Sequence, residues 1–296
     1  MTFQTELQHA ANLVEQRLDR LLAAGPTLEA RSTLAEAMRY AVLGGGKRLR
    51  PFLLIQSARL FGVDESRALD PACALECVHC YSLVHDDLPA MDDDAVRRGR
   101  PTVHVAFGEA TAILVGDALL TLAFEIMSGN SADTDPAIRA ELVHLLARAA
   151  GWHGMALGQA LDLDAERNDL KAEQVAAMQA LKTGALFGFA CEAGAVLGRA
   201  DASKRAALKD YASALGQAFQ LADDLLDAEG SAEAVGKAVA KDADRGKATL
   251  VGLLGMDAAK ARLAALVAEA EAALAPFGAK ANTLVATAQF AVSRKR

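Results

Sequence analysis

The 296-residue sequence lacks the motifs of several common enzyme classes. It has no Gly-x-Ser-x-Gly, His-Glu-x-x-His or Gly-x-Gly-x-x-Gly pattern and no evident nucleophile beside a base, which argues against serine hydrolases, zincins and dinucleotide-binding enzymes. Basic residues number 31 against 38 acidic ones and form no one-faced cluster, so no nucleic acid partner is expected. The N-terminus carries no signal-peptide pattern, and the most apolar stretch, residues 183–198, is short and contains Glu192. We therefore expect a soluble, cytoplasmic protein with no membrane span.

Cysteine is also scarce, with four residues in all. On a helix, Cys73, Cys77 and Cys80 share one stripe that lies well round from His79. A zinc site would need two further ligands, and no second cysteine pair supplies them. We therefore expect all four cysteines to be reduced thiols in the core.

The pattern that is present is helical. Nearly every segment shows a 3.6-residue period with little strand alternation, and alanine and leucine are abundant. No linker composition interrupts the chain, which predicts a single domain over residues 1–296. We expect an all-α bundle of about ten to twelve helices, several of them longer than twenty residues.

Two acidic segments follow apolar helical runs. HDDLPAMDDD, residues 85–94, puts five aspartates into ten residues, and Pro89 should end the helix before it. Within that helix Asp86 lies on the same stripe as His79 and Ser82, while Asp87 lies about 100° round.

The second acidic segment is QLADDLLDAEG. Its four polar residues follow i, i+3, i+4 and i+7 spacing on one helical stripe: Gln220, Asp223, Asp224 and Asp227. A single acidic run is usually a solvated helix face. Two runs within apolar helices, each followed by basic residues, favour Mg²⁺, which binds one or two carboxylates together with water and phosphate.

Basic residues follow both acidic runs and a glycine loop at residues 44–46. The candidates for phosphate contact are Lys47, Arg48, Arg50, Arg97, Arg98, Lys182, Lys237, Lys241 and Lys247. The glycine loop lacks Walker A spacing and a preceding strand, so it is either a helix stop or a loop that lets Gly46 and Lys47 approach an anion. Metal and phosphate ligands without a nucleophile suit a reaction in which diphosphate leaves and a carbocation forms.

Several segments resemble the ordered motifs of short-chain trans-prenyl diphosphate synthases, with the closest likeness to the bacterial farnesyl type. They are GGGKRLRP, ECVHCYSLVHDDLPAMDDDAVRRGRPTVH, GDALLTLAFE, GMALGQALDL, LKTGALF and AFQLADDLLD, followed by the GK...D...GK pattern of residues 236–247. The resemblance implies a dimeric, all-helical isoprenoid-synthase fold with a central cavity between the two aspartate-rich helices. It also implies condensation of isopentenyl diphosphate with an allylic diphosphate, assisted by two or three Mg²⁺ ions.

The resemblance also implies roles for individual residues. The metal ligands would be Asp86, Asp87, Asp92, Asp223 and Asp227. The allylic diphosphate would be held by Arg97, Lys182, Lys237 and Lys247, and isopentenyl diphosphate by Gly46, Lys47, Arg50, His79 and Arg98. Thr183, Gln159 and Gln220 would present oxygens to the developing cation.

Product length would depend on the pocket floor, which the resemblance assigns to Tyr81 and Ser82. The bulk of Tyr81 and the Pro89-Ala90 insertion favour a fifteen-carbon product, with geranyl and geranylgeranyl diphosphate as the neighbouring alternatives. One pocket residue changes discrimination by only a few kcal/mol.

The sequence departs from the family pattern after Lys247. The usual Ser-Thr-Tyr-Pro-like continuation is Ala-Thr-Leu-Val at residues 248–251, and a glycine expected near Ala240 is missing, which leaves the role of Lys241 open. The basic end, Arg294, Lys295 and Arg296, is either a substrate contact or a frayed terminus.

Two other functions share part of this pattern. A non-catalytic partner subunit of a related synthase would be expected to have lost aspartates that this chain retains. A terpene cyclase would not need a second diphosphate site, and Lys47, Arg50 and His79 argue for one.

Overall fold

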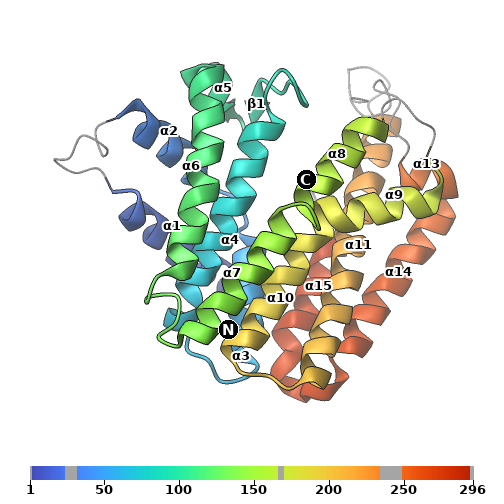
Figure 1. Ribbon diagram of the computed structural model, residues 1–296. Coiled ribbons are helices and arrows are strands. Elements are labelled where there is room, and N and C mark those ends of the chain that lie inside the picture. Colours follow the sequence, from blue (N-terminus) through green and yellow to red (C-terminus); the bar gives the residue numbers. More distant parts are fainter. Residues whose placement is uncertain (1, 24–31, 166–169, 234–248, 294–296) are drawn as a thin grey trace. The chain divides into compact units, whose positions relative to one another are not determined.

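The computed structural model describes residues 2–23, 32–165, 170–233 and 249–293 (Figure 1). These residues form helices and one short hairpin, which confirms the all-α prediction. The candidates Lys237, Lys241 and Lys247 and the basic C-terminal residues lie outside the described residues. The chain divides into two compact units, residues 1–146 with 196–199 and residues 147–195 with 200–296. That the chain folds as a single domain stays a prediction.

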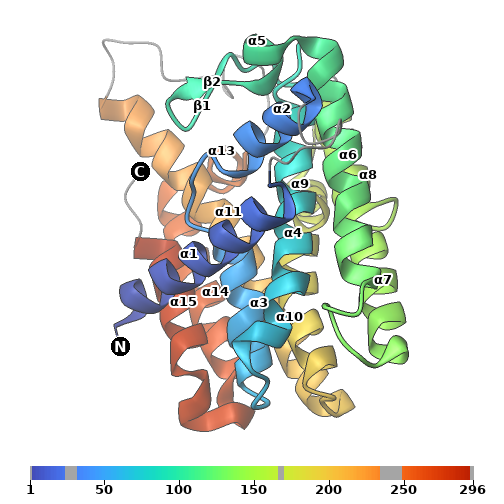
Figure 2. The same ribbon diagram turned by 90° about the vertical axis from the view of Figure 1, so that its left-hand side faces the viewer.

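The first unit is built around α4. Its elements are α1 (Phe3–Leu21), α2 (Thr33–Val42), α3 (Leu49–Arg59), α4 (Glu65–Asp86), β1 (Val96–Arg97), β2 (Arg100–Pro101), α5 (Val103–Phe107), α6 (Glu109–Ser128) and most of α7 (Pro136–Ala150). The α4 helix packs against α6 and α3, as Figure 1 and Figure 2 show. Its middle is buried on every side, since all residues from Pro71 to Val78 are buried. This explains why the sequence there, apart from Glu76, is apolar all round rather than on one stripe.

The second unit is built around α11. Its elements are α8 (Met155–Ala165), α9 (Ala172–Gln179), a π-helical turn (Ala180–Gly184), most of α10 (Ala185–Leu197), α11 (Ala202–Glu233), α13 (Leu250–Leu254), α14 (Met256–Ala273), a 3₁₀ segment (Ala275–Ala281) and α15 (Asn282–Ser293). The α11 helix packs against α14 and α15. Tyr211 anchors it, because its buried hydroxyl donates to the Leu284 carbonyl at 2.8 Å.

The described residues contain fourteen α-helices, more than the ten to twelve expected. Two glycines explain part of the excess: Gly108 (φ +87°) separates α5 from α6, and Gly255 (φ +83°) separates α13 from α14. In the described part of the chain, α4, α11 and the continuous helical stretch Ala172–Leu197 exceed twenty residues, which agrees with the expectation of several long helices.

Two helical stretches are long and apolar enough, by length and composition alone, to cross a bilayer: Glu109–Ser128 and Ala172–Leu197. In the most apolar 18 residues of each stretch, 39% of Glu109–Ser128 and 56% of Ala172–Leu197 is buried within the structure. Core helices of soluble proteins meet the same criterion, and the expectation that the chain lacks a membrane span stays a prediction.

Candidate active site

The first acidic segment begins where regular helix ends. The α4 helix stops at Asp86, as Pro89 predicts, and the chain then folds back on itself. The Asp92 amide donates to the Asp86 carbonyl at 2.8 Å, and the Asp94 amide donates to the Asp87 carbonyl at 3.2 Å. The reversal passes through Asp93, whose φ is +50°. Backbone hydrogen bonding therefore brings Asp86 and Asp92 together.

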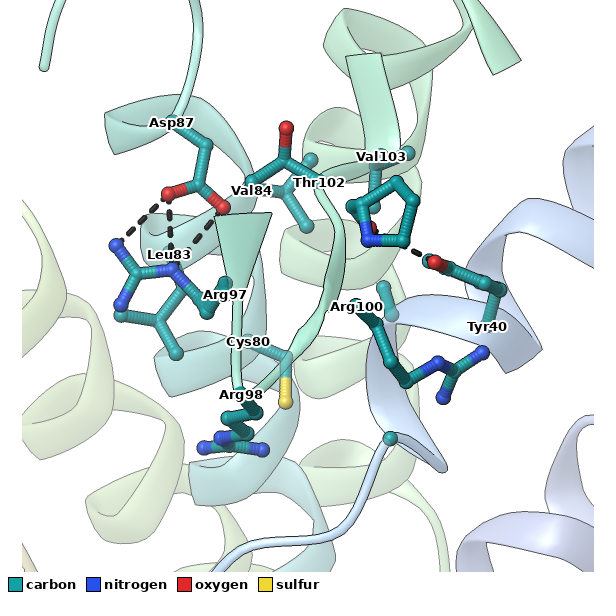
Figure 3. A pocket seen from close by; sticks show the side chains of 13 residues that line it. Tyr40, Cys80, Leu83, Val84, Asp87, Arg97, Arg98, Arg100, Thr102 and Val103 are labelled. Atoms are coloured by element: carbon teal, nitrogen blue, oxygen red, sulfur yellow. Dashed lines mark hydrogen bonds and ion pairs between the residues drawn. The ribbon is translucent and has the colours of Figure 1, made fainter. Parts of the chain in front are cut away.

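Asp87 points elsewhere. Its buried carboxylate accepts from Arg97 Nε at 2.8 and 3.0 Å, and Arg97 Nη2 lies 2.7 Å from Oδ1 (Figure 3). Burial raises the pKa of Asp87 above its usual range, although the Arg97 guanidinium opposes the shift. In this arrangement Asp87 orients Arg97, and its role as a metal ligand stays a prediction.

Arg97 and Arg98 lie on a hairpin that the helical period did not predict. Val96 pairs with Pro101 and Arg97 with Arg100, so the connection is the dipeptide Arg98-Gly99. Both of its residues have positive φ, 52° and 73°, as a type I′ turn requires. This turn directs Arg98 to the glycine loop, where its Nη1 donates to the Gly45 carbonyl.

The glycine loop is shaped to receive that side chain. Gly46 has φ +126°, and a Cβ built on it would lie 2.8 Å from Cζ of Arg98. Any other residue at position 46 would displace the guanidinium, so the loop and the hairpin are fitted to each other.

Arg50 and His79 lie together in the first unit, with Nη1 of Arg50 3.5 Å from Nε2 of His79. Burial, together with the positive charge of Arg50, lowers the pKa of His79 well below its ordinary value. The imidazole is therefore neutral at pH 7. Lys47 is exposed on the adjoining loop.

The lowered pKa of His79 predicts a pH effect on stability. A depressed folded-state pKa means that the unfolded chain binds the proton more readily, so stability is lost as pH falls below the unfolded value of about 6.5. His79→Gln should remove up to about 1.4 kcal/mol of this loss per pH unit. Thermal midpoints of both proteins from pH 7 to pH 5 measure it, and parallel curves would contradict the assignment.

Tyr81 and Ser82 both lie near the end of α4. Ser82 Oγ donates to the His79 carbonyl at 2.9 Å. Tyr81 is partly buried, and burial together with the nearby Asp86 raises its pKa to about 12. Its ring packs edge-on against His85 at 5.9 Å between centroids. His85 in turn fills the space left by Gly116, where a Cβ would meet its Nε2 at 1.9 Å.

Arg48 does not join the phosphate candidates. The sequence grouped it with Lys47 and Arg50, but its guanidinium is buried and paired with Glu76 at 2.6 Å. The phosphate-binding expectation for Arg48 was therefore wrong, because Glu76 already holds Nη1 and the Val42 carbonyl holds Nη2.

In the second unit, Lys182 and Thr183 lie within the π-helical turn. Lys182 Nζ is 2.7 Å from Oδ2 of Asp162, and Thr183 Oγ1 donates to Gln220 Oε1 at 3.1 Å. Gly158 makes the packing possible, because a Cβ there would lie 2.1 Å from the Lys182 backbone nitrogen. Single π-helical turns are often found at functional sites.

Gln159 neighbours Gly158 on α8, and both of its amide atoms are buried without a hydrogen-bond partner among the described residues. Leaving such a group unsatisfied costs about 1–3 kcal/mol. The Gln159 amide therefore has hydrogen-bonding capacity that no described side chain uses, and its contact with substrate stays a prediction.

The aspartates of α11 differ from one another. Asp224 accepts from Gln179 at 3.2 Å and from Gln220 at 3.1 Å, and burial raises its pKa although both amides oppose the shift. Asp223 is half-buried and Asp227 is exposed. Gln179 was not anticipated, because no spacing rule connects it to Asp224, which is 45 residues away.

These residues fit magnesium better than zinc. Over the described ranges, no three His, Cys, Asp or Glu side chains form a ready-made metal cluster. Mg²⁺ does not need one, since it takes one or two carboxylates and completes its shell with water and phosphate. The four cysteines are free and buried, and burial raises the pKa of Cys80 to about 12. This confirms the prediction of reduced core thiols.

Together, the fold and these side chains define an all-α protein that carries two acidic segments and basic residues able to bind phosphate. The model of the polyprenyl synthetase family matches residues 31–276, and the chain belongs to this family. The expected isoprenoid-synthase fold is thereby confirmed.

Individual relatives agree over nearly the whole chain. A farnesyl diphosphate synthase of Escherichia coli is 41% identical and covers 100% of both chains. One from Geobacillus stearothermophilus is 43% identical over 87% of this chain and 86% of the relative. The solved apo structure of an FPP/GFPP synthase from Zymomonas mobilis has a TM-score of 0.89 at 45% identity, covering 98% of this chain and 99% of the other.

Proposed function

We propose that the protein is a prenyltransferase that condenses isopentenyl diphosphate with dimethylallyl or geranyl diphosphate, with farnesyl diphosphate as its main product. The observation that carries this proposal is a pair of distinct cationic sets in the first unit. Arg97 accompanies the acidic segment, whereas Arg50 lies beside His79 next to the glycine loop. Two sets suit two diphosphates, and the full-length likeness to farnesyl diphosphate synthases agrees.

The chain's own residues would act on charge and position. The ligands for Mg²⁺ would be Asp86, Asp87, Asp92, Asp223 and Asp227, and the metal, when bound, would neutralise charge growing on the leaving diphosphate. Arg97 and Lys182 would hold the same diphosphate by charge-assisted hydrogen bonds, joined by Lys237 and Lys247 from the undescribed segment. Lys47, Arg50, His79 and Arg98, with Gly46 beside them, would hold the second substrate.

The reaction breaks the allylic C–O bond and forms one carbon–carbon bond, and the adduct then loses a proton to the released diphosphate. The Thr183 hydroxyl donates a hydrogen bond to Gln220 Oε1. The lone pairs of Thr183 Oγ1 then remain available to face the developing cation. Water has to be excluded, because it would trap the cation as an alcohol.

The test is a Mg²⁺-dependent turnover assay on the purified protein alone. We expect diphosphate release only when isopentenyl and allylic diphosphates are both present. No release at saturating metal and substrates removes the proposal and favours a partner-subunit role. A hydrocarbon formed without isopentenyl diphosphate would instead indicate a terpene cyclase.

Product length is tested at Tyr81. We expect fifteen-carbon product from the wild type, and Tyr81→Ala should extend it to twenty carbons or more by deepening the pocket. Chromatography of the dephosphorylated products measures both. The effect is a redistribution rather than a loss of rate, since one side chain shifts discrimination by a few kcal/mol. Unchanged products would place the pocket floor elsewhere.

We also propose that the protein is a cytoplasmic homodimer. The support is an apolar surface on α6, where Ile113 and Leu114 are 47% and 54% exposed. Large exposed aliphatic side chains on a core helix are typical of subunit contacts. Leu114→Glu should therefore shift the molar mass in light scattering from dimer to monomer, and a wild-type monomer would contradict the proposal.

A further inference from the structure

We propose that Arg48 and Glu76 are positioning residues for the isopentenyl diphosphate subsite. Their buried ion pair fixes the glycine loop and so sets the places of Lys47 and Arg50. This inference rests on the proposed function, which supplies the identity of the subsite. Arg48 itself would touch no substrate.

The pair is almost completely enclosed. The side chains of Arg48 and Glu76 are 1% and 2% exposed, and Nη1 lies 2.6 Å from Oε1. Arg48 Nη2 donates to the carbonyl of Val42, the last residue of α2. One guanidinium therefore ties together the end of α2, the middle of α4 and the loop between α2 and α3.

The loop backbone is held in a conformation that it would not adopt unaided. Arg48 has φ +48° and ψ 40°, the left-handed region that L-residues other than glycine, asparagine and aspartate seldom occupy. It is also the N-cap of α3 and makes no side-chain capping hydrogen bond. Such strain persists only where the surroundings over-determine it. The hydrogen bonds of the guanidinium to Glu76 and to the Val42 carbonyl hold the Arg48 backbone in this conformation.

The consequence reaches both neighbouring cations. Lys47 precedes Arg48 directly, and Arg50 follows Arg48 by two residues in the first turn of α3, so the backbone conformation of Arg48 sets the direction of both. On the opposite side, Arg98 donates to the Gly45 carbonyl. The loop is thus fixed at one end by the buried pair and at the other by the hairpin.

A role in stability alone does not account for this arrangement. Buried ion pairs can often be replaced by packed apolar side chains without loss of stability, so an ion pair is not required merely to fill the space. What apolar residues cannot do is accept and donate in fixed directions. The geometry therefore points to orientation of the loop as the function of the pair.

The test separates stability from positioning with the double variant Arg48→Met/Glu76→Leu. We expect a thermal midpoint near that of the wild type, at least tenfold weaker binding of isopentenyl diphosphate by calorimetry, and a matching rise in its KM. The KM for geranyl diphosphate and kcat should stay within about threefold. Glu76→Gln and Arg48→Lys should also weaken isopentenyl diphosphate binding at least tenfold, so the conclusion does not depend on one variant.

The matched control is a second ion pair of α4, in which Arg17 contacts Asp70 at 2.6 and 2.9 Å. Asp70→Asn should lower the thermal midpoint and leave isopentenyl diphosphate binding unchanged. Variants of Arg48 and Glu76 that fold and bind isopentenyl diphosphate like the wild type would overturn the inference. If the wild type itself neither binds isopentenyl diphosphate nor turns over, the proposed function has failed, and that result is distinct from the variant pattern.

Discussion

Asp86→Asn should lower kcat by about three orders of magnitude or more, the largest effect expected of a single substitution in this chain. The carboxylate lies at the end of α4 and is brought to Asp92 by the 2.8 Å backbone hydrogen bond. Losing the negative charge of a metal ligand should reduce the stabilisation of the transition state by several kcal/mol. Each 1.36 kcal/mol added to the activation free energy lowers the rate about tenfold. Asp223→Asn on α11 should have an effect of similar size.

The matched control is Asp93→Asn in the same loop. Asp93 is exposed and has φ +50°, a conformation that asparagine tolerates well. Its kcat should therefore stay within about threefold of the wild type. Circular dichroism should show unchanged helicity in every variant, and Asp86→Asn and Asp223→Asn with wild-type kcat would show that the metal site is misplaced.

The features that local patterns determine were predictable from the sequence. Proline two residues past the C-cap makes Asp86 the last residue of α4, and the 3.6-residue period puts Asp223 and Asp227 on one stripe of α11. The buried cysteines follow from an apolar helix without further metal ligands. In each case, residues within about two helical turns decide the outcome.

The features that the sequence did not reveal depend on distant partners. Lys47 and Arg48 are indistinguishable as neighbouring cations, and only Glu76, 28 residues further on, withdraws Arg48 from phosphate contact. Likewise, Asp87 was grouped with Asp86 until the hairpin returned Arg97 to it. The local sequence does not distinguish an aspartate that pairs with a distant guanidinium from the aspartate next to it.

Helix breaks show the same limit. Residues 151–154 separate α7 from α8, although no proline and no run of polar turn residues marks a break there in the sequence. Gly154 explains the tight connection, since a Cβ there would lie 2.1 Å from the Ala149 carbonyl oxygen. Glycine within a helical pattern is common enough that the sequence alone did not distinguish this break from a tolerated residue.

Gly158→Ala should strongly disturb the π-helical turn that carries Lys182 and Thr183. The added Cβ would lie 2.1 Å from the backbone nitrogen of Lys182 and 2.5 Å from its Cα, so a helix has to move rather than a side chain. Overpacking of this kind typically costs about 1–3 kcal/mol of stability. Because the displaced segment carries Lys182 and Thr183, and a misplacement of about 1 Å can cost about a hundredfold in rate, kcat should fall about a hundredfold.

Gly188→Ala on α10 is the control for Gly158→Ala, because nothing lies within 4 Å of a Cβ built there. Alanine inside a helix should stabilise by up to about 1 kcal/mol, so this variant should have a higher thermal midpoint and unchanged kcat. The two substitutions add the same methyl group to two helices of one unit. Equal kcat values in both would mean that the close approach of α8 to the π-helical turn does not position Lys182 and Thr183 for the reaction.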